Sequence, residues 1–202
     1  MISKTNNAKV IHYRDGVKYS GNIVVPETIE YDGIIYNVTI IADQAFSYSS
    51  GLTSVTIPNS VTNIGDGAFK GCSSLTQITI GNSVERMGMH AFGKCPEIKD
   101  VYCYTENVPS TNDNDAFVDS YIDYATLHVL DASVNLYKSA EPWKNFKEII
   151  ALTDSDPKPS GIKMINNTTY GVNKFYNLSG LEIEDPQKGI YITNGKKIVM
   201  KK

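Results

Sequence analysis

Long apolar runs are missing from this sequence, which nowhere approaches the about 20 consecutive apolar residues of a membrane-spanning helix. The opening residues, Met1 to Lys4, also lack the basic-then-apolar layout of a signal peptide, so export would depend on a signal that this chain does not contain. Charge of one sign is equally scarce, because 19 basic and 22 acidic residues give a net charge of -3 without long like-charged runs. We therefore expect neither a membrane span nor a nucleic-acid partner.

Residues that carry chemistry are few. The three cysteines include no Cys-x-x-Cys pair, and no histidine stands at metal-ligand spacing, which argues against a zinc site and a dense disulfide framework. The histidines, His12, His90 and His128, share no motif, and no nucleophile elbow, phosphate loop or dinucleotide fingerprint occurs. We expect a protein that is not an enzyme and uses no cofactor or metal.

The dipeptide Ala-Phe recurs along the chain and sets a period. Its phenylalanines, Phe46, Phe69, Phe92 and Phe117, are separated by steps of 23, 23 and 25 residues. Further apolar columns keep the same phase, namely Val38/Val61/Val84, Ile41/Ile64/Met87, Leu52/Leu75/Ile98, Val55/Ile78/Val101 and Ile57/Ile80/Cys103. A unit this short cannot bury its own apolar edge, so stacked units must share one core. The period predicts a right-handed solenoid.

Within one unit, two kinds of spacing follow each other. Leu75, Ile78 and Ile80 end in the alternation of a half-buried strand, whereas the apolar residues between 84 and 92 have a spacing that suits a short helical or 3₁₀ turn. We therefore predict an α/β solenoid with a 23-residue period and one short strand plus one helical turn per repeat.

The segment from Val55 to Leu75, VTIPNSVTNIGDGAFKGCSSL, resembles the BspA-like (surface antigen) leucine-rich-repeat family. The match runs from about residue 23 to 150 and rests on Ile-Pro, Ile-Gly, Ala-Phe and Gly-Cys at fixed spacing. Met87-Gly88-Met89 departs from the pattern, as does the third repeat from Asp100 to Tyr104 with its two-residue insertion. The resemblance implies a leucine-rich-repeat fold and a surface protein that binds other macromolecules.

We predict four parts. Residues 1–22 form a β-hairpin cap with a turn at Asp15-Gly16, and a second Asp-Gly hairpin turn follows at 32–33. Residues 23–153 form the solenoid, with a last strand at 127–129, a short helix capped by Ser133, and Trp143 closing the core. Residues 154–161 have linker composition. Residues 162–202 form a small all-β module with an Asn194-Gly195 hairpin; it resembles sorting-type segments of exported bacterial proteins, which implies secretion or surface attachment.

Two finer hypotheses concern the acidic loop and the thiols. Asp113, Asp115, Asp119 and Asp123 invite a calcium site, but Phe117 and Val118 stand where an EF-hand loop needs a ligand and a glycine, so a solvated loop is favoured. Cys72 and Cys95 hold the same repeat position, so a disulfide between adjacent turns is conceivable. Stacked free thiols remain the preferred reading.

The outward strand positions form columns across the expected sheet. The middle column reads Val24, Thr56, Thr79, Tyr102 and His128, between the columns Ser54, Gln77, Asp100 and Pro58, Gly81, Tyr104. Aromatic side chains on a rigid sheet are candidate recognition anchors. The candidate binding face consists of Thr56, Gln77, Thr79, Asp100, Tyr102, Tyr104 and His128.

We predict a monomeric, non-catalytic protein-binding module of an exported or cell-surface bacterial protein. The resemblance implies adhesion to proteins of the host extracellular matrix or of bacterial surfaces. Two alternatives stay open: a carbohydrate-binding accessory module that stacks sugars on Tyr102, Tyr104 and His128, and a purely structural spacer.

Overall fold

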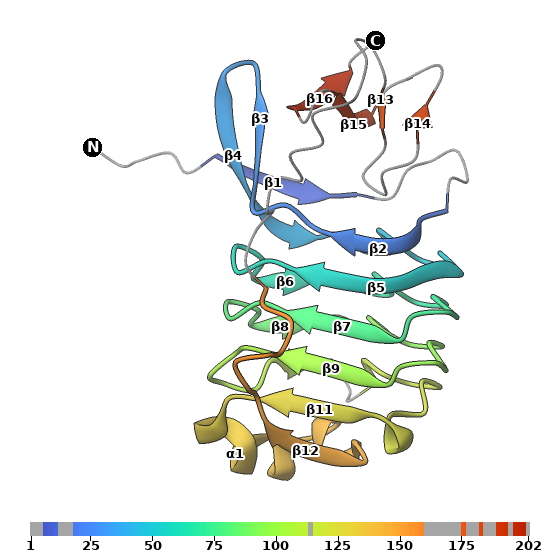
Figure 1. Ribbon diagram of the computed structural model, residues 1–202, viewed down its shortest axis with the longest axis vertical. Helices are drawn as coiled ribbons and strands as arrows, with labels where there is room; N and C mark the ends of the chain where they lie inside the picture. Colours follow the sequence, from blue (N-terminus) through green and yellow to red (C-terminus); the bar gives the residue numbers. More distant parts are fainter. Residues whose placement is uncertain are drawn as a thin grey trace.

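The structure is a computed structural model, and it describes residues 6–11, 18–112 and 115–159 together with four strands between Phe175 and Met200. Its strands stack in rows along one long axis, with the chain advancing row by row (Figure 1). Two parallel sheets run along this axis, joined in every turn by loops.

The first sheet, here called the long-strand sheet, faces the viewer in Figure 1. It contains β2 (Ser20–Val24), β5 (Gly51–Ile57), β7 (Gln77–Ile80), β9 (Asp100–Cys103), β11 (Thr126–Val129) and β12 (Glu148–Ala151). The second, the short-strand sheet, contains β1 (Asn7–Val10), β4 (Ile34–Ile41), β6 (Asn63–Ile64), β8 (Arg86–Met87) and β10 (Ser110–Thr111), with β3 (Thr28–Tyr31) antiparallel on β4.

Hydrogen-bonded register brings equivalent residues of successive repeats side by side. In the long-strand sheet Ser54 pairs with Gln77, Gln77 with Asp100, and Asp100 with Thr126. In the short-strand sheet Ile41 pairs with Ile64, and Ile64 with Met87. Each outward position therefore continues as a column along the solenoid.

The core is organised around a column of phenylalanine rings. Phe46, Phe69 and Phe92 stack with centroids 4.9 Å apart and nearly parallel planes, and Phe117 follows at 5.7 Å. Tyr19 packs edge-on against the first ring. The apolar columns predicted from the sequence are all buried around these rings, so that prediction is confirmed.

The return segments differ from the prediction. In place of a helical turn, the return segments contain the two-residue strands β6, β8 and β10 of the short-strand sheet together with turns, so the expectation of helix in these segments is wrong. The hydrogen bonds explain why, because many backbone groups bond to the neighbouring turn of the solenoid: Gly65 N–H donates to Ile41 O at 2.8 Å and Gly88 N–H to Ile64 O at 2.8 Å.

The N-terminal end also differs. The predicted turn at Asp15-Gly16 lies outside the described residues, but the strands on either side of it do not pair with each other: β1 pairs parallel with β4, and β2 parallel with β5. Both strands thus extend the solenoid. The second hairpin is confirmed, since Tyr31 pairs with Ile34 across Asp32 and Gly33, both with positive φ.

At the other end the sheet continues one strand beyond the predicted last one, because β12 pairs parallel with β11. The 3₁₀ helix η1 (Ile122–Tyr124) precedes β11, and η2 (Asp131–Ser133), α1 (Val134–Ser139) and η3 (Trp143–Asn145) lie between β11 and β12. The predicted short helix is present, although the Ser133 hydroxyl bonds to Glu106 O at 2.7 Å instead of capping it. Trp143 is fully buried and packs edge-on against Phe117, as predicted.

Beyond β12, residues 153–159 fold back onto the solenoid and are here called the strap. Asp156 accepts hydrogen bonds from the backbone and the hydroxyl of Thr153, which holds the strap in a compact turn. Farther on, β13 (Phe175–Tyr176), β14 (Glu182–Ile183), β15 (Gly189–Thr193) and β16 (Lys196–Met200) form an antiparallel sheet, while Asn194-Gly195 lies outside the described residues. No helix in the described part of the chain is long and apolar enough to cross a membrane.

Candidate binding face

The outward columns lie where the sequence places them. Register pairs Val24 with Thr56, Thr56 with Thr79, Thr79 with Tyr102, and Tyr102 with His128. The chemically varied residues therefore collect over β9 and β11, toward the C-terminal end of the long-strand sheet.

Three of the candidate residues form a fixed cluster, here called the tyrosine–histidine cluster: Asp100, Tyr102 and His128. The rings of Tyr102 and His128 stack with centroids 4.3 Å apart. His128 Nε2 lies 3.1 Å from Asp100 Oδ1, a distance at which the ring N–H donates to the carboxylate. Partial burial, with the nearby carboxylates of Asp100 and Asp156, raises the pKa of Tyr102 above its ordinary value, so its hydroxyl stays protonated. The cluster presents a neutral phenol beside a carboxylate.

Tyr104 is held by the strap. Its hydroxyl donates to Pro157 O at 3.0 Å, and Lys158 Nζ lies over its ring at 5.8 Å from the centroid. Burial and the negative charge of Asp156 raise its pKa. The prediction treated Tyr104 as a free outward ring and residues 154–161 as a plain linker; in the structure the two are in contact.

The remaining candidates differ in exposure. Thr56 and Gln77 are partly exposed. Thr79 is 0% exposed, and its Oγ1 has no hydrogen-bond partner among the described residues. A partner molecule cannot touch Thr79 on this surface, so its place on the face is corrected.

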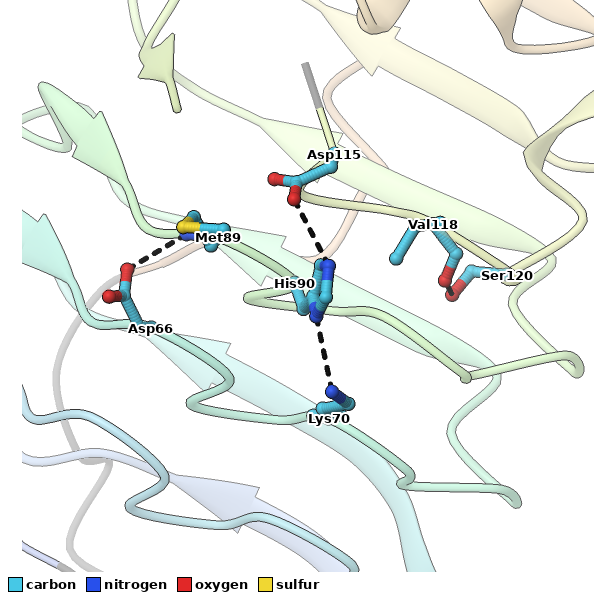
Figure 2. Close-up of polar contacts among 7 residues, drawn as sticks. All are labelled: Asp66, Lys70, Met89, His90, Asp115, Val118 and Ser120. Carbon is cyan, nitrogen blue, oxygen red and sulfur yellow. Dashed lines mark hydrogen bonds and ion pairs between the residues drawn. The ribbon is translucent and has the colours of Figure 1, made fainter. Parts of the chain in front are cut away.

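A second polar cluster lies on the turn side of the solenoid. Figure 2 shows His90 between Lys70 below and Asp115 above: Lys70 Nζ lies 3.1 Å from His90 Nδ1, and His90 Nε2 lies 3.0 Å from Asp115 Oδ2. Ser120, in the same view, donates instead to the carbonyl of Phe92 at 2.6 Å, away from the imidazole. The contacts link three successive turns of the solenoid, which gives His90 a structural role.

The acidic loop is described only in part, and the three cysteine thiols are buried. Asp113 lies outside the described residues, and Asp115 is engaged by His90, while no three His, Cys, Asp or Glu side chains of the described part converge as metal ligands. Cys72, Cys95 and Cys103 are buried and free. The thiols of Cys72 and Cys95 donate to Phe46 O and Phe69 O, both at 3.2 Å, and hydrogen bonding to Cys95 and burial raise the pKa of Cys72.

Comparison with known proteins gives one family. The family described as BspA type Leucine rich repeat region matches residues 27–138, in six copies. Comparison with curated proteins found no match.

Three solved structures are similar to this chain at low identity. A leucine-rich repeat protein from Bacteroides capillosus is 24% identical with a TM-score of 0.48, and the match covers 61% of this chain and 87% of that one. A leucine rich cell surface protein from Faecalibacterium prausnitzii is 21% identical with a TM-score of 0.44, covering 72% and 46%. A leucine-rich repeat protein from Bacteroides ovatus is 23% identical with a TM-score of 0.44, and the match covers 72% of this chain and 39% of that one. The chain thus spans less than half of the latter two.

Proposed function

The chain belongs to the family of BspA-type leucine-rich repeats, and from this premise we propose that it is a non-catalytic protein-binding module of an exported or cell-surface bacterial protein. The partner is a protein of the host extracellular matrix or of a bacterial surface. The binding surface is the outward face of the long-strand sheet over β7, β9 and β11, with Gln77, Asp100, Tyr102 and His128 as its contacts.

The tyrosine–histidine cluster is the observation that carries this proposal. Binding costs less when the anchoring side chains are already immobile, because their rotamer entropy is lost on folding and not on association. Tyr102 is held by the stack with His128, and His128 by Asp100. Tyrosine is also enriched among the residues that dominate protein interfaces.

The cluster favours a protein partner over a sugar stacked on the same rings. A sugar needs an open aromatic face, whereas one face of Tyr102 is occupied by His128 and the hydroxyl of Tyr104 is bonded to the strap. A structural spacer would need no such cluster and remains the outcome if no partner is found.

The test compares the partly exposed Tyr102 with the exposed Tyr124 on a panel of immobilised host matrix proteins and bacterial surface proteins. Tyr102→Ala should weaken binding to the retained partner at least about tenfold, the usual size of a hot-spot effect. Tyr124→Ala, in η1 and 76% exposed, is the matched control and should leave binding unchanged. Equal loss in both variants, or no loss in Tyr102→Ala, would remove the proposed face, and the absence of any bound protein would leave the spacer.

A further inference from the structure

A second surface feature lies at the corner between the two sheets, away from the tyrosine–histidine cluster. Here the loops after β5, β7 and β9 and the end of the strap surround a hollow of about 770 Å³. The polar residues that line it include Asn59, Asn82, Glu85, Tyr104, Glu106 and Lys158. In size it falls within the range of small-ligand sites, roughly 300–1,000 Å³.

The hollow results from an irregularity in the repeat. Asn63 of β6 pairs with Arg86 of β8, but Arg86 pairs with Ser110 of β10, so the loop after β9 is one residue longer than the loop before it. That longer loop contributes Glu106, Asn107 and Pro109 to the lining. Lys158 and Pro159 of the strap line it as well.

Two asparagines that line the hollow, Asn59 and Asn82, have amide groups available as donors. Asn59 Oδ1 accepts the backbone N–H of Asn82 at 2.9 Å, and Asn82 Oδ1 accepts the hydroxyl of Ser83 at 3.0 Å. Neither side-chain NH₂ group has a hydrogen-bond partner among the described residues. Both asparagines are therefore fixed through their oxygens while their donors remain available.

The charges around the hollow limit what it can hold. The carboxylates of Glu85 and Glu106 are exposed and disfavour an anionic ligand. Among the described residues that line the hollow the one cation is Lys158, which is engaged with the carbonyl of Thr153 at 3.2 Å and with the ring of Tyr104. A hydroxyl-rich neutral ligand suits this lining, because each hydroxyl both donates to carboxylates and accepts from amides.

We propose that this hollow, here called the asparagine groove, is a binding site for a short neutral oligosaccharide. The amides of Asn59 and Asn82 donate to sugar hydroxyls, and the carboxylates of Glu85 and Glu106 accept from them. The site is separate from the protein-binding face proposed above and stands without it.

The test titrates neutral trisaccharides of glucose, galactose, mannose and N-acetylglucosamine into the full chain by calorimetry. At least one should bind, and Asn82→Ala should weaken it about tenfold, which corresponds to one lost hydrogen bond to a polar ligand. Asn82 is exposed, and its side chain makes a hydrogen bond only to Ser83 among the described residues, so the variant should fold. Tyr124→Ala, which changes an exposed side chain outside the lining of the hollow, is the control and should bind the sugar unchanged.

A basic peptide is the competing ligand, and Glu85→Gln separates the two. The isosteric amide keeps the hydrogen-bonding shape, so it should change trisaccharide affinity less than about threefold, whereas a charged ligand would lose about tenfold or more. Binding of a triarginine peptide that weakens with salt and with Glu85→Gln, without sugar binding, overturns the proposal. So does the failure of every trisaccharide to bind at millimolar concentration.

Discussion

A methyl group added at Gly65 tests the close stacking of adjacent turns. In Gly65→Ala the new Cβ would lie 2.5 Å from the backbone nitrogen of Asp43 and 2.7 Å from the carbonyl carbon of Ala42, whereas ordinary contact begins at 3.4 Å. The obstacle is backbone of the preceding repeat, which cannot rotate away as a side chain can. The two turns must therefore separate at this point.

The cost has two parts. Forcing extra atoms into a packed region costs about 1–3 kcal/mol. Separating the turns also weakens the bonds Gly65 N–H to Ile41 O, 2.8 Å, and Asp66 N–H to Asp43 Oδ1, 2.9 Å, at about 1 kcal/mol each. We expect a loss of about 3–5 kcal/mol in the free energy of unfolding.

Gly67→Ala is the matched control, two residues away. Gly67 has φ +58° and no neighbouring atom closer than 3.6 Å to an added Cβ, so only the left-handed backbone penalises alanine, by about 1 kcal/mol. The equivalent positions Gln44 and His90 already adopt this conformation with side chains.

Guanidinium unfolding, followed by circular dichroism and by the fluorescence of Trp143, measures both variants. Two probes are needed because repeats can open separately from one another. If Gly65→Ala is no more destabilising than Gly67→Ala, the stacked turns are not in the contact described here.

Two further predictions concern buried groups near the core. Burial, followed by the charge of Cys103, raises the pKa of Tyr137, while an unfolded tyrosine titrates near about pH 10. The contribution of protonated Tyr137 to the free energy of unfolding is therefore complete below about pH 10 and is lost as pH rises beyond it. Urea unfolding should show a steep fall of this free energy at alkaline pH, and the fall should be shallower in Tyr137→Phe. An equally steep fall in the variant would contradict this assignment. The three buried cysteines should resist dithionitrobenzoate in the native protein and all react after unfolding without reductant. A single reactive thiol would instead reveal a Cys72–Cys95 bridge.

The buried columns could be predicted because apolar residues recur at regular intervals from one repeat to the next. Successive repeats place apolar side chains at matching positions, so Phe69 and Phe92, 23 residues apart, were expected to share an environment whatever the details of the turns. The outward columns followed from the same register, which is why Thr79, Tyr102 and His128 were correctly aligned.

The return segment was mispredicted for a physical reason. Helix-like spacing separates Val84, Met87 and Ala91. This spacing arises from the bends within one turn of the solenoid, because each bend directs one side chain into the core. A helix forms its backbone hydrogen bonds within the segment, whereas here many backbone hydrogen bonds are made to the neighbouring turn. The sequence of one segment does not show which of the two sets of partners its backbone groups will have.

The contacts of the strap could not be predicted from the sequence either. Tyr104 and Pro157 lie 53 residues apart, and the segment around Pro157 has the composition of a linker. Nothing periodic relates the two, so neither the contact nor the hollow beside it follows from the pattern. The burial of Thr79 was missed for a similar reason, since alternation predicts an outward side chain and not what covers it.

The matched register of the two sheets means that the length of the solenoid can change by whole repeats. A second copy of residues 63–85 placed before Arg86 would meet the same partners on both sides, because Asn63 already pairs with Arg86. Each such copy would add one ring to the phenylalanine column and lengthen the molecule by the 4.9 Å between ring centres. Duplication of 23 residues thus changes the distance between the two ends by one repeat, and the added repeat makes the same contacts as the existing ones.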